Sequence, residues 1–162
     1  MSGGEDAARR IGVISDTHDL LRPEALQALE GSDLILHAGD ICGPEVLQAL
    51  REIAPVIAVR GNNDREPWAK DLPLSEAFEV GRASIYVLHD INELDLDPRA
   101  GGFSVVISGH SHQPRCEERD GVLFFNPGSA GPRRFRLPIS LGHIVVAGAR
   151  VTGHLKTLGV HA

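Results

Sequence analysis

The stretch VISDTH occupies residues 13–18 and ends the first strongly apolar run of the chain with a carboxylate, Asp16, and an imidazole, His18. The continuous β-branched run before it is typical of a strand that is buried on both faces. A charged side chain beside such a strand destabilises the fold unless something binds it. The interpretation of this pair therefore depends on whether similar residues follow the later strands.

The composition indicates a globular protein with an aliphatic core. The 162 residues are most simply one domain, predicted to span residues 9–162 after a flexible lead-in over residues 1–8. Hydrophobic residues make up 42% of the chain and aromatic residues only 4%, so Val, Ile, Leu and Ala must fill most of the core. The formal net charge of −6 argues against a nucleic-acid-binding surface. It does not exclude a small phosphate-bearing substrate at a metal site.

Cysteine usage and apolar runs bear on the cellular compartment. Cys42 and Cys116 lie far apart and outside any paired-spacing motif, so neither a disulfide framework nor a thiolate zinc site is expected. The N-terminal segment lacks the apolar centre of a signal peptide, and no apolar run approaches the roughly 20 residues of a membrane helix. We therefore expect a soluble, cytoplasmic protein without a membrane partner.

The first half of the chain alternates predicted strands and helices. Strands are expected within residues 10–15, 34–40 and 56–64, and helices within residues 22–33 and 43–55. This alternation implies a parallel sheet with right-handed crossovers.

The second half is predicted to be mostly β-structure. Residues 77–90, 115–129 and 140–158 are each expected to form a hairpin, and residues 103–112 a single buried strand with a polar end. The turn at Asp120-Gly121 favours positive φ angles, as two-residue hairpin loops require.

Side chains that can bind a metal follow five successive predicted strands. Because the carboxyl ends of parallel strands gather at one edge of a sheet, we expect these side chains to lie together. The set contains two aspartates, one asparagine and four histidines: Asp16, His18, Asp40, Asn62, His89, His110 and His112. Oxygen and nitrogen ligands without thiolate suit Mn²⁺, Fe²⁺ or Zn²⁺. Two such ions roughly 3.5–4 Å apart can clamp the attacking and leaving oxygens of a phosphoryl transfer.

In chain order these motifs read D-x-H, G-D, G-N-x-D, a lone strand-end H and G-H-x-H. With them the chain resembles the calcineurin-like metallophosphoesterase superfamily over residues 11–158, and within it the small bacterial and archaeal phosphodiesterases. The resemblance implies an α/β fold, a four-layer αββα sandwich of two mixed β-sheets flanked by helices. It also implies a metal-dependent phosphoric ester hydrolase with two divalent ions per chain, Mn²⁺ being expected and Fe, Zn, Ni or Mg the alternatives.

The resemblance further implies a role for each residue of the site. One ion would be bound by Asp16, His18 and His112, and the other by Asn62, His89 and His110. Asp40 would bridge the two ions, and a hydroxide between them would attack phosphorus. The predicted catalytic residues are Asp40, Asn62, Asn63 and His110. The predicted substrate contacts are Asn62 and Arg133.

Two positions depart from the family pattern. Many relatives have a histidine at the position of Asn63, where it protonates the leaving oxygen, and an amide cannot act as this general acid. General acid catalysis is typically worth 10²–10⁴-fold, so we expect a preference for good leaving groups. Asp90 follows His89 where a glycine is common, and its carboxylate would either orient a ligand or repel anionic substrates. Asp64 is expected to brace the loop that carries Asn62.

Several alternatives stay open on the sequence alone. The same site would serve a phosphomonoesterase or nucleotidase, and some relatives, such as a retromer trafficking subunit, serve mainly as protein-interaction scaffolds. Scaffold members tend to lose metal-site histidines, whereas all seven positions are filled here. The arginines of NPGSAGPRRFR (residues 126–136) either lie in solvent or reach a substrate phosphate or a partner subunit. The expected partners are a small phosphate-ester substrate and, through an apolar face of the second half, a second copy of the chain.

Overall fold

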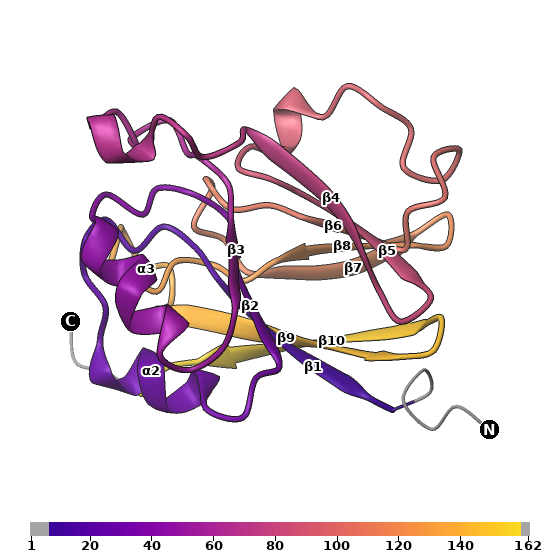
Figure 1. Cartoon of the computed structure of the whole chain (residues 1–162), viewed down its shortest axis with the longest axis horizontal. Coiled ribbons are helices and arrows are strands. Elements are labelled where there is room, and N and C mark those ends of the chain that lie inside the picture. The colour runs from indigo at the N-terminus through magenta and orange to yellow at the C-terminus, as the bar shows by residue number, and fades with distance from the viewer. Residues whose placement is uncertain (1–6, 160–162) are drawn as a thin grey trace.

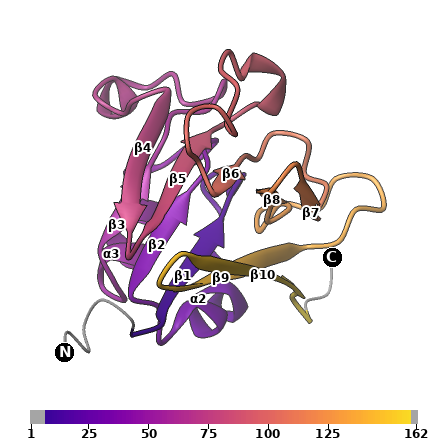
Figure 2. The same ribbon diagram turned by 90° about the vertical axis from the view of Figure 1, so that its right-hand side faces the viewer.

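In the computed structural model, residues 7–159 are described, and they form two five-stranded mixed sheets that stack face to face (Figures 1 and 2). The first sheet has the order β10 (Arg150–Thr157), β9 (Ser140–Ala147), β1 (Arg9–Ile14), β2 (Leu34–His37) and β3 (Val56–Ala58). The second has the order β4 (Ser75–Val80), β5 (Ala83–Leu88), β6 (Val105–Ile107), β8 (Val122–Asn126) and β7 (Arg115–Arg119). The predicted lead-in over residues 1–8 lies largely outside the described residues.

The predicted alternation in the first half of the chain is confirmed. Strands β1, β2 and β3 are parallel neighbours, joined by helices α2 (Pro23–Leu29) and α3 (Pro44–Arg51). Both helices begin with a proline at the first helical position, where the missing N–H has no intrahelical role. Helix α3 buries Val46, Leu47 and Leu50, which recur at helical spacing along one face.

The predicted hairpins are also confirmed, but their sheet partners could not be assigned from sequence. The turn between β7 and β8 places Asp120 and Gly121 at φ angles of 52° and 79°, as expected for this pair. The last hairpin, β9–β10, returns to the first sheet, where β9 runs antiparallel to β1. The last strands of the chain thus complete the sheet that its first strand began.

Apolar side chains fill three successive layers. One cluster, which includes Leu29, Leu47 and Leu50, lies between the first sheet and helices α2 and α3, on the side away from the second sheet (Figures 1 and 2). A second cluster lies between the two sheets and contains Ile11, Val87 and Phe125, among others. Almost all of its members are aliphatic, as the composition predicts.

The predicted fold class is confirmed, with a thinner outer layer over the second sheet than over the first. There the buried Leu88, Val106 and Val122 pack against Ile91 and Leu94, which belong to or follow the short 3₁₀ helix η2 (Ile91–Glu93). A second 3₁₀ helix, η1 (Pro67–Ala69), lies between β3 and β4. Among residues 7–159, no helix is long and apolar enough to span a membrane.

Candidate metal centre

The loops that follow β1, β2, β3, β5 and β6 converge, and they bring the seven predicted metal ligands together. Two groups of these side chains have their ligand atoms within 4.8 Å of one another: Asp16, His18 and His112, and Asp16, Asp40 and His89. Asn62 and His110 adjoin the second group, because Asn62 Oδ1 lies 2.9 Å from His89 Nε2 and 3.1 Å from His110 Nδ1. The arrangement draws on both sheets, since β5 and β6 belong to the second.

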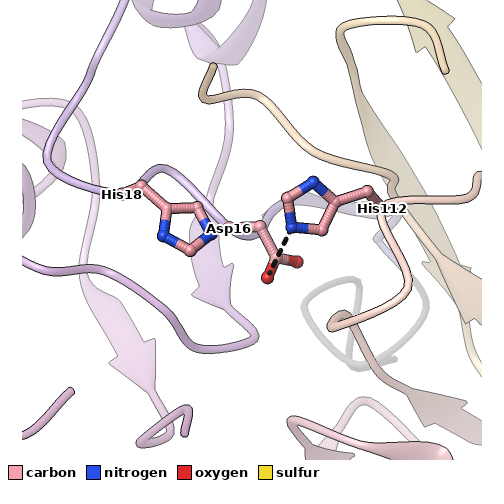
Figure 3. Close-up of side chains that lie close together, drawn as sticks. All are labelled: Asp16, His18 and His112. Atoms are coloured by element: carbon pink, nitrogen blue, oxygen red, sulfur yellow. Dashed lines mark ion pairs between the residues drawn. The ribbon is translucent and has the colours of Figure 1, made fainter. Parts of the chain in front are cut away.

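The first group, which we call the buried group, consists of Asp16, His18 and His112. Figure 3 shows the two imidazoles on either side of the Asp16 carboxylate, with ring centroids 5.5 Å apart. Asp16 is fully buried, and its Oδ1 lies 3.4 Å from His112 Nε2. Its Oδ2 accepts hydrogen bonds from the Ser15 hydroxyl at 2.7 Å and from the His110 backbone N–H at 3.0 Å, which fixes the plane of the carboxylate.

The buried group contains polar atoms that the protein itself does not satisfy. Among the described residues, the buried side-chain atoms without a hydrogen-bond partner are Asp16 Oδ1, His18 Nε2, His112 Nδ1 and Arg22 Nε. A buried polar atom left without a partner costs about 1–3 kcal/mol, so three of them in one group require an explanation. Burial also lowers the pKa of His18, against the opposing charges of Asp40 and Asp16, which favours the neutral imidazole that a metal ion needs. The residues present therefore fit a divalent cation.

The second of these groups shares His89 with a further set of donors, Asn62, His89 and His110, which we call the open group. His89 Nδ1 donates to the Ala38 carbonyl at 2.7 Å, which directs its other nitrogen, Nε2, toward the site. That nitrogen lies 3.3 Å from His110 Nδ1 as well as near Asn62. The His110 side chain is 42% exposed, and its Nε2 lies 3.7 Å from Asp90 Oδ2. The polar atoms of this group thus bond one another and are partly open to solvent.

Asp40 lies between the two groups, where the sequence predicts a bridging ligand. Its Oδ2 is 3.4 Å from His89 Nε2 and 3.7 Å from His18 Nε2. Burial disfavours the Asp40 anion, but hydrogen bonds from His89 and Asn63 outweigh it and lower the pKa of this carboxyl. Burial likewise disfavours the His89 cation, but its hydrogen bond to Asp40 and the charges of Asp16 and Asp40 raise the pKa of His89 to about 9. The Asp40 carboxylate therefore stays ionised, and a protonated His89 partly balances its charge.

The backbone at the site is held in an uncommon conformation. Five of the seven predicted ligands have positive φ angles: Asp16 at 56°, His18 at 46°, Asp40 at 57°, His110 at 69° and His112 at 63°. Non-glycine residues avoid this region, which costs roughly 1–2 kcal/mol per residue, and they keep it only where the surroundings impose it. Such a concentration of strained residues is typical of functional sites.

Hydrogen bonds from outside the ligand set hold these loops in place. The buried carboxylate of Asp64 accepts four backbone N–H groups, from Asp40, Ile41, Cys42 and Gly61, at 2.8–2.9 Å. The prediction that Asp64 braces the loop carrying Asn62 is thereby confirmed. Asn63 donates from its backbone N–H to Asp40 Oδ1 at 2.8 Å and from its side-chain amide to Asp40 Oδ2 at 2.9 Å.

Two further side chains support these loops: His37, for which its place inside a strand predicts buried hydrogen bonding to neighbouring backbone rather than ligation, and Asn126, which was not identified from the sequence. His37 Nδ1 accepts from the Gly39 N–H at 3.1 Å, so its Nε2 donates to the Thr17 hydroxyl at 3.0 Å, which in turn donates to the Ile41 carbonyl at 3.1 Å. Asn126, at the end of β8, donates to the Gly109 carbonyl at 2.9 Å and anchors the loop of His110 and His112. The one available signal for Asn126 was its position as a further polar residue at the end of a strand.

The arginine-rich loop lies beside the buried group. A Cβ atom on Gly131 would come within 2.4 Å of the Asp16 and Thr17 carbonyls, so this loop packs directly on the ligand loop. Arg133, the predicted substrate contact, donates from its Nε to the Leu137 carbonyl of its own loop at 3.3 Å. The Arg134 charge is close enough to contribute to the lowered pKa of His18.

Comparisons with known sequences agree with this geometry. A family model described as the calcineurin-like phosphoesterase superfamily domain matches residues 10–148. A probable metallophosphoesterase of Methanothermobacter thermautotrophicus is 40% identical over 131 residues, which cover 74% of this chain and 76% of that protein. A phosphodiesterase of Methanocaldococcus jannaschii is 32% identical over 138 residues, covering 74% of this chain and 82% of that protein.

Solved structures show the same fold. Vacuolar protein sorting 29 from Cryptosporidium parvum superposes with a TM-score of 0.80 at 22% identity, covering 94% of this chain and 93% of that one, a likeness of fold alone. The structure of an archaeal phosphodiesterase superposes with a TM-score of 0.75 at 27% identity and covers 91% of this chain and 99% of that one.

Proposed function

This chain belongs to the calcineurin-like phosphoesterase superfamily, and we propose that it is a phosphodiesterase that works with two divalent metal ions. The observation that carries the proposal is the group of unpartnered buried atoms on Asp16, His18 and His112, next to a second set of donors across Asp40. The phosphodiesterase name of the Methanocaldococcus jannaschii relative supports the choice of reaction. When bound, two ions polarise a phosphate ester and activate water for attack on phosphorus.

Each predicted ligand has a role in this proposal. Asp16, His18 and His112 hold one ion, and Asn62, His89 and His110 hold the other, with Asp40 between them. The hydrogen bonds of Asp16 to Ser15 and of His89 to Ala38 orient these ligands before an ion arrives. We retain Asp40, Asn62 and His110 as proposed catalytic residues, because Asp40 lies between the two groups and the other two belong to the more exposed one.

Oxygen and nitrogen ligation makes Mn²⁺ our proposed ion. Cys42 lies beside the site, with its Sγ 3.7 Å from His18 Nδ1. Burial and the neighbouring carboxylates, Asp64 first among them, raise the pKa of the Cys42 thiol to about 12. The thiol therefore stays protonated and does not add the soft ligand that would select other metals.

Asn63 sets the range of leaving groups. Its amide is bonded to the Asp40 carboxylate and has no acidic proton to give, so the leaving oxygen must depart as an anion or take its proton from solvent. We therefore propose that esters of acidic alcohols and phenols are hydrolysed fastest. Rates on aryl and alkyl phosphodiesters that differ only slightly would contradict this proposal.

Substrate contacts come from Asn62 and from the arginine-rich loop. Arg133 was predicted to bind substrate, but in this structure its Nε is bonded within its own loop. Arg134 is exposed, and its positive charge helps to lower the pKa of His18. We retain Arg133 as a proposed contact and add Arg134, since a guanidinium on this loop is placed to meet a phosphate at the buried group.

A protein-interaction scaffold is the second candidate function. The observation that favours it is the fold shared with vacuolar protein sorting 29. Phosphomonoesterase action is a third reading of the same metal site. A complete set of ligands supports an enzyme over a scaffold. The predicted homodimer and the cytoplasmic location stay predictions.

The test measures metal content and activity together. We expect about two Mn²⁺ per chain by elemental analysis, and Mn²⁺-dependent hydrolysis of bis(4-nitrophenyl) phosphate after prior chelation. The Asp40→Ala variant should lose both, because it removes the carboxylate that faces both groups of ligands. Two ions without turnover on diesters but with turnover on 4-nitrophenyl phosphate would favour the phosphomonoesterase. No metal and no turnover would favour the scaffold.

A further inference from the structure

A hollow of about 520 Å³ opens beside Asn62, on the outer side of the loop that follows β3. Its lining extends from the end of that strand across the Asn62 loop to η1, and it includes Arg60, Asn62, Arg65, Glu66, Lys70 and Leu74. Nothing in the metal centre itself requires this hollow. It is therefore a separate feature that adjoins the proposed reaction site.

The side chains of the hollow give it a positive charge in a chain with a net charge of −6. Within residues 7–159, neither the Arg60 guanidinium nor the Lys70 ammonium forms a hydrogen bond or an ion pair. Arg65 donates from its Nε to the Asn62 carbonyl at 3.1 Å, which leaves its terminal nitrogens for another partner.

The carboxylates that line the hollow do not cancel this charge. Asp64 is buried, and its two oxygens are occupied by four backbone N–H groups. Glu66 is the remaining carboxylate of the lining, against three cations. Arg60 is partly buried, and a partly buried cation without a counter-charge is unfavourable unless an anion binds beside it.

Asn62 connects the hollow to the metal centre. Its side-chain oxygen lies 2.9 Å from His89 Nε2, among the ligands, while the residue itself lines the hollow and its carbonyl orients Arg65. A phosphate held at the open group would therefore lie next to Asn62, which also lines the hollow. A substrate can reach both places at once if it carries a second anionic group close to the scissile one.

We propose that this hollow binds a second phosphate group of the substrate, so that the preferred substrates are phosphodiesters that carry a further phosphate on one side of the scissile bond. The inference rests on the proposed function. Arginine presents paired N–H groups that match phosphate oxygens, and Lys70 adds a point charge. Leu74, 64% exposed on the same lining, offers an apolar surface for the organic group between the two phosphates.

The experiment compares two esters that differ only in the second phosphate. They are the 4-nitrophenyl ester of thymidine 5′-phosphate and the same ester with a phosphate on the 3′ oxygen. Water adds to the 5′ phosphorus, the bond from phosphorus to the aryl oxygen breaks, and 4-nitrophenolate leaves. We expect kcat/KM to be about tenfold higher for the ester with the 3′ phosphate, mainly through a lower KM.

Variants test whether the hollow causes this preference. The ratio of kcat/KM between the two esters should fall to near one in the Arg60→Gln, Lys70→Gln double variant, and part of the way in Lys70→Gln alone. Lys70 is exposed, so the single variant tests the inference even if the double variant does not fold. The control matched to Lys70→Gln is Arg150→Gln, which also removes one positive charge, from an exposed position at the start of β10, and should leave the ratio unchanged.

The outcomes separate this inference from the proposed function. Equal kcat/KM for the two esters in the unmodified protein overturns the inference while the hydrolysis itself supports the phosphodiesterase. An equal loss of preference in Arg150→Gln also overturns it, because the effect would then come from net charge. If neither ester is hydrolysed with Mn²⁺, the proposed function fails, and calorimetry of thymidine 3′,5′-bisphosphate against thymidine 5′-monophosphate decides the inference. Tighter binding of the bisphosphate, lost in Lys70→Gln, supports it, and equal binding overturns it.

Discussion

The two halves of the candidate metal centre differ in how their polar atoms are satisfied. In the buried group, Asp16, His18 and His112 each leave one buried polar atom without a partner. In the open group, Asn62 accepts hydrogen bonds from His89 and His110, and solvent reaches part of His110. The chain therefore has two sets of similar ligand atoms. Some of those in the buried group lack a hydrogen-bond partner, whereas the side chains of the open group hydrogen-bond one another.

From this difference we predict that the two proposed ions bind unequally. A cation at the buried group gives ligand bonds to atoms that lack a hydrogen-bond partner, and it replaces only long ion pairs, such as the 3.4 Å contact between Asp16 Oδ1 and His112 Nε2. A cation at the open group must break the Asn62 hydrogen bonds and remove a proton from His89, whose pKa is raised to about 9 by Asp40 and Asp16 against the effect of burial. The buried group should hold its ion more tightly.

The difference between the buried group and the open group is tested most directly by removing one ligand from each. Asp16→Asn removes the charge of the buried group and should lower kcat/KM on bis(4-nitrophenyl) phosphate by at least about 10³-fold, with loss of the tightly bound ion. His110→Ala removes an exposed ligand and should cost only about 10–100-fold, which added Mn²⁺ should partly restore. Elemental analysis of both variants after gel filtration shows how many ions each has lost. Equal losses of activity and metal in the two variants would contradict the division into a tight and a weak site.

Titration of the metal-free protein with Mn²⁺ sharpens the comparison without a mutation. At pH 7 we expect two binding steps, the second weaker than the first by about 100-fold, since His89 must lose a proton two pH units below its raised pKa. The second step should strengthen about tenfold per unit of rising pH up to pH 9. Calorimetry in two buffers of different ionisation enthalpy counts the proton released in that step. A second step that releases no proton would remove the basis of the prediction.

The order of the elements was predictable because local signals decide it. The alternation of apolar runs and helical spacing predicted the parallel strands β1, β2 and β3, and Asp120-Gly121 predicted the β7–β8 turn. The return of β9 to the side of β1 was not predictable in this way, since it depends on contacts between the two ends of the chain. The thin outer layer over the second sheet likewise depends on how Ile91 and Leu94 pack.

The membership of the candidate site was predictable for a topological reason. The carboxyl ends of parallel strands lie at one edge of a sheet, so polar residues that follow the strands meet there. In this fold they meet even though the strands belong to two sheets. The positive φ angles of Asp16, Asp40 and the other ligands were not predicted, because aspartate and histidine tolerate this conformation but adopt it only where the surrounding structure imposes it. The positioning role of Asn63 on Asp40 was also missed, since only the structure brings the two together.

Asp64 connects the loop of Asp40 with the loop of Asn62. Its substitution should weaken metal binding less than the loss of a metal ligand does. Its carboxylate ties the backbone of the Asp40 loop to that of Gly61, beside Asn62. Asp64→Asn keeps the shape but replaces two oxygen acceptors with one and adds a donor among N–H groups. We expect about tenfold weaker Mn²⁺ binding at the second step and a loss of about 2 kcal/mol in the free energy of unfolding.

The control for this variant is Asp33→Asn. Asp33 is exposed and accepts a single backbone N–H, from Arg10, at 2.8 Å. Its substitution should change neither metal step and should lower the unfolding free energy by less than about 1 kcal/mol. Similar effects of the two substitutions, measured by urea unfolding and Mn²⁺ titration, would show that Asp64 has no special role in joining the halves.

The buried group has one support with no counterpart in the open group, the hydrogen bond from His37 to Thr17, which lies between Asp16 and His18. Burial lowers the pKa of His37 to about 3 from 6.5. At any pH between these values, His37 is therefore protonated in the unfolded chain and neutral in the folded protein. The stability that neutral His37 provides is complete above pH 6.5 and is lost as the pH falls below it, at about 1.4 kcal/mol per pH unit.

Between pH 7 and pH 5 the metal-free protein should lose about 2 kcal/mol through this group. His37→Gln should be less stable at pH 7 but should lack this part of the pH dependence, whereas His154→Gln, at an exposed position on β10, should keep it. Urea unfolding of the three proteins at pH 5, 6 and 7 measures the slopes. Parallel slopes for His37→Gln and the unmodified protein would mean that His37 is free to take a proton in the folded state, and that the loop of the buried group is less tightly held than its hydrogen bonds indicate.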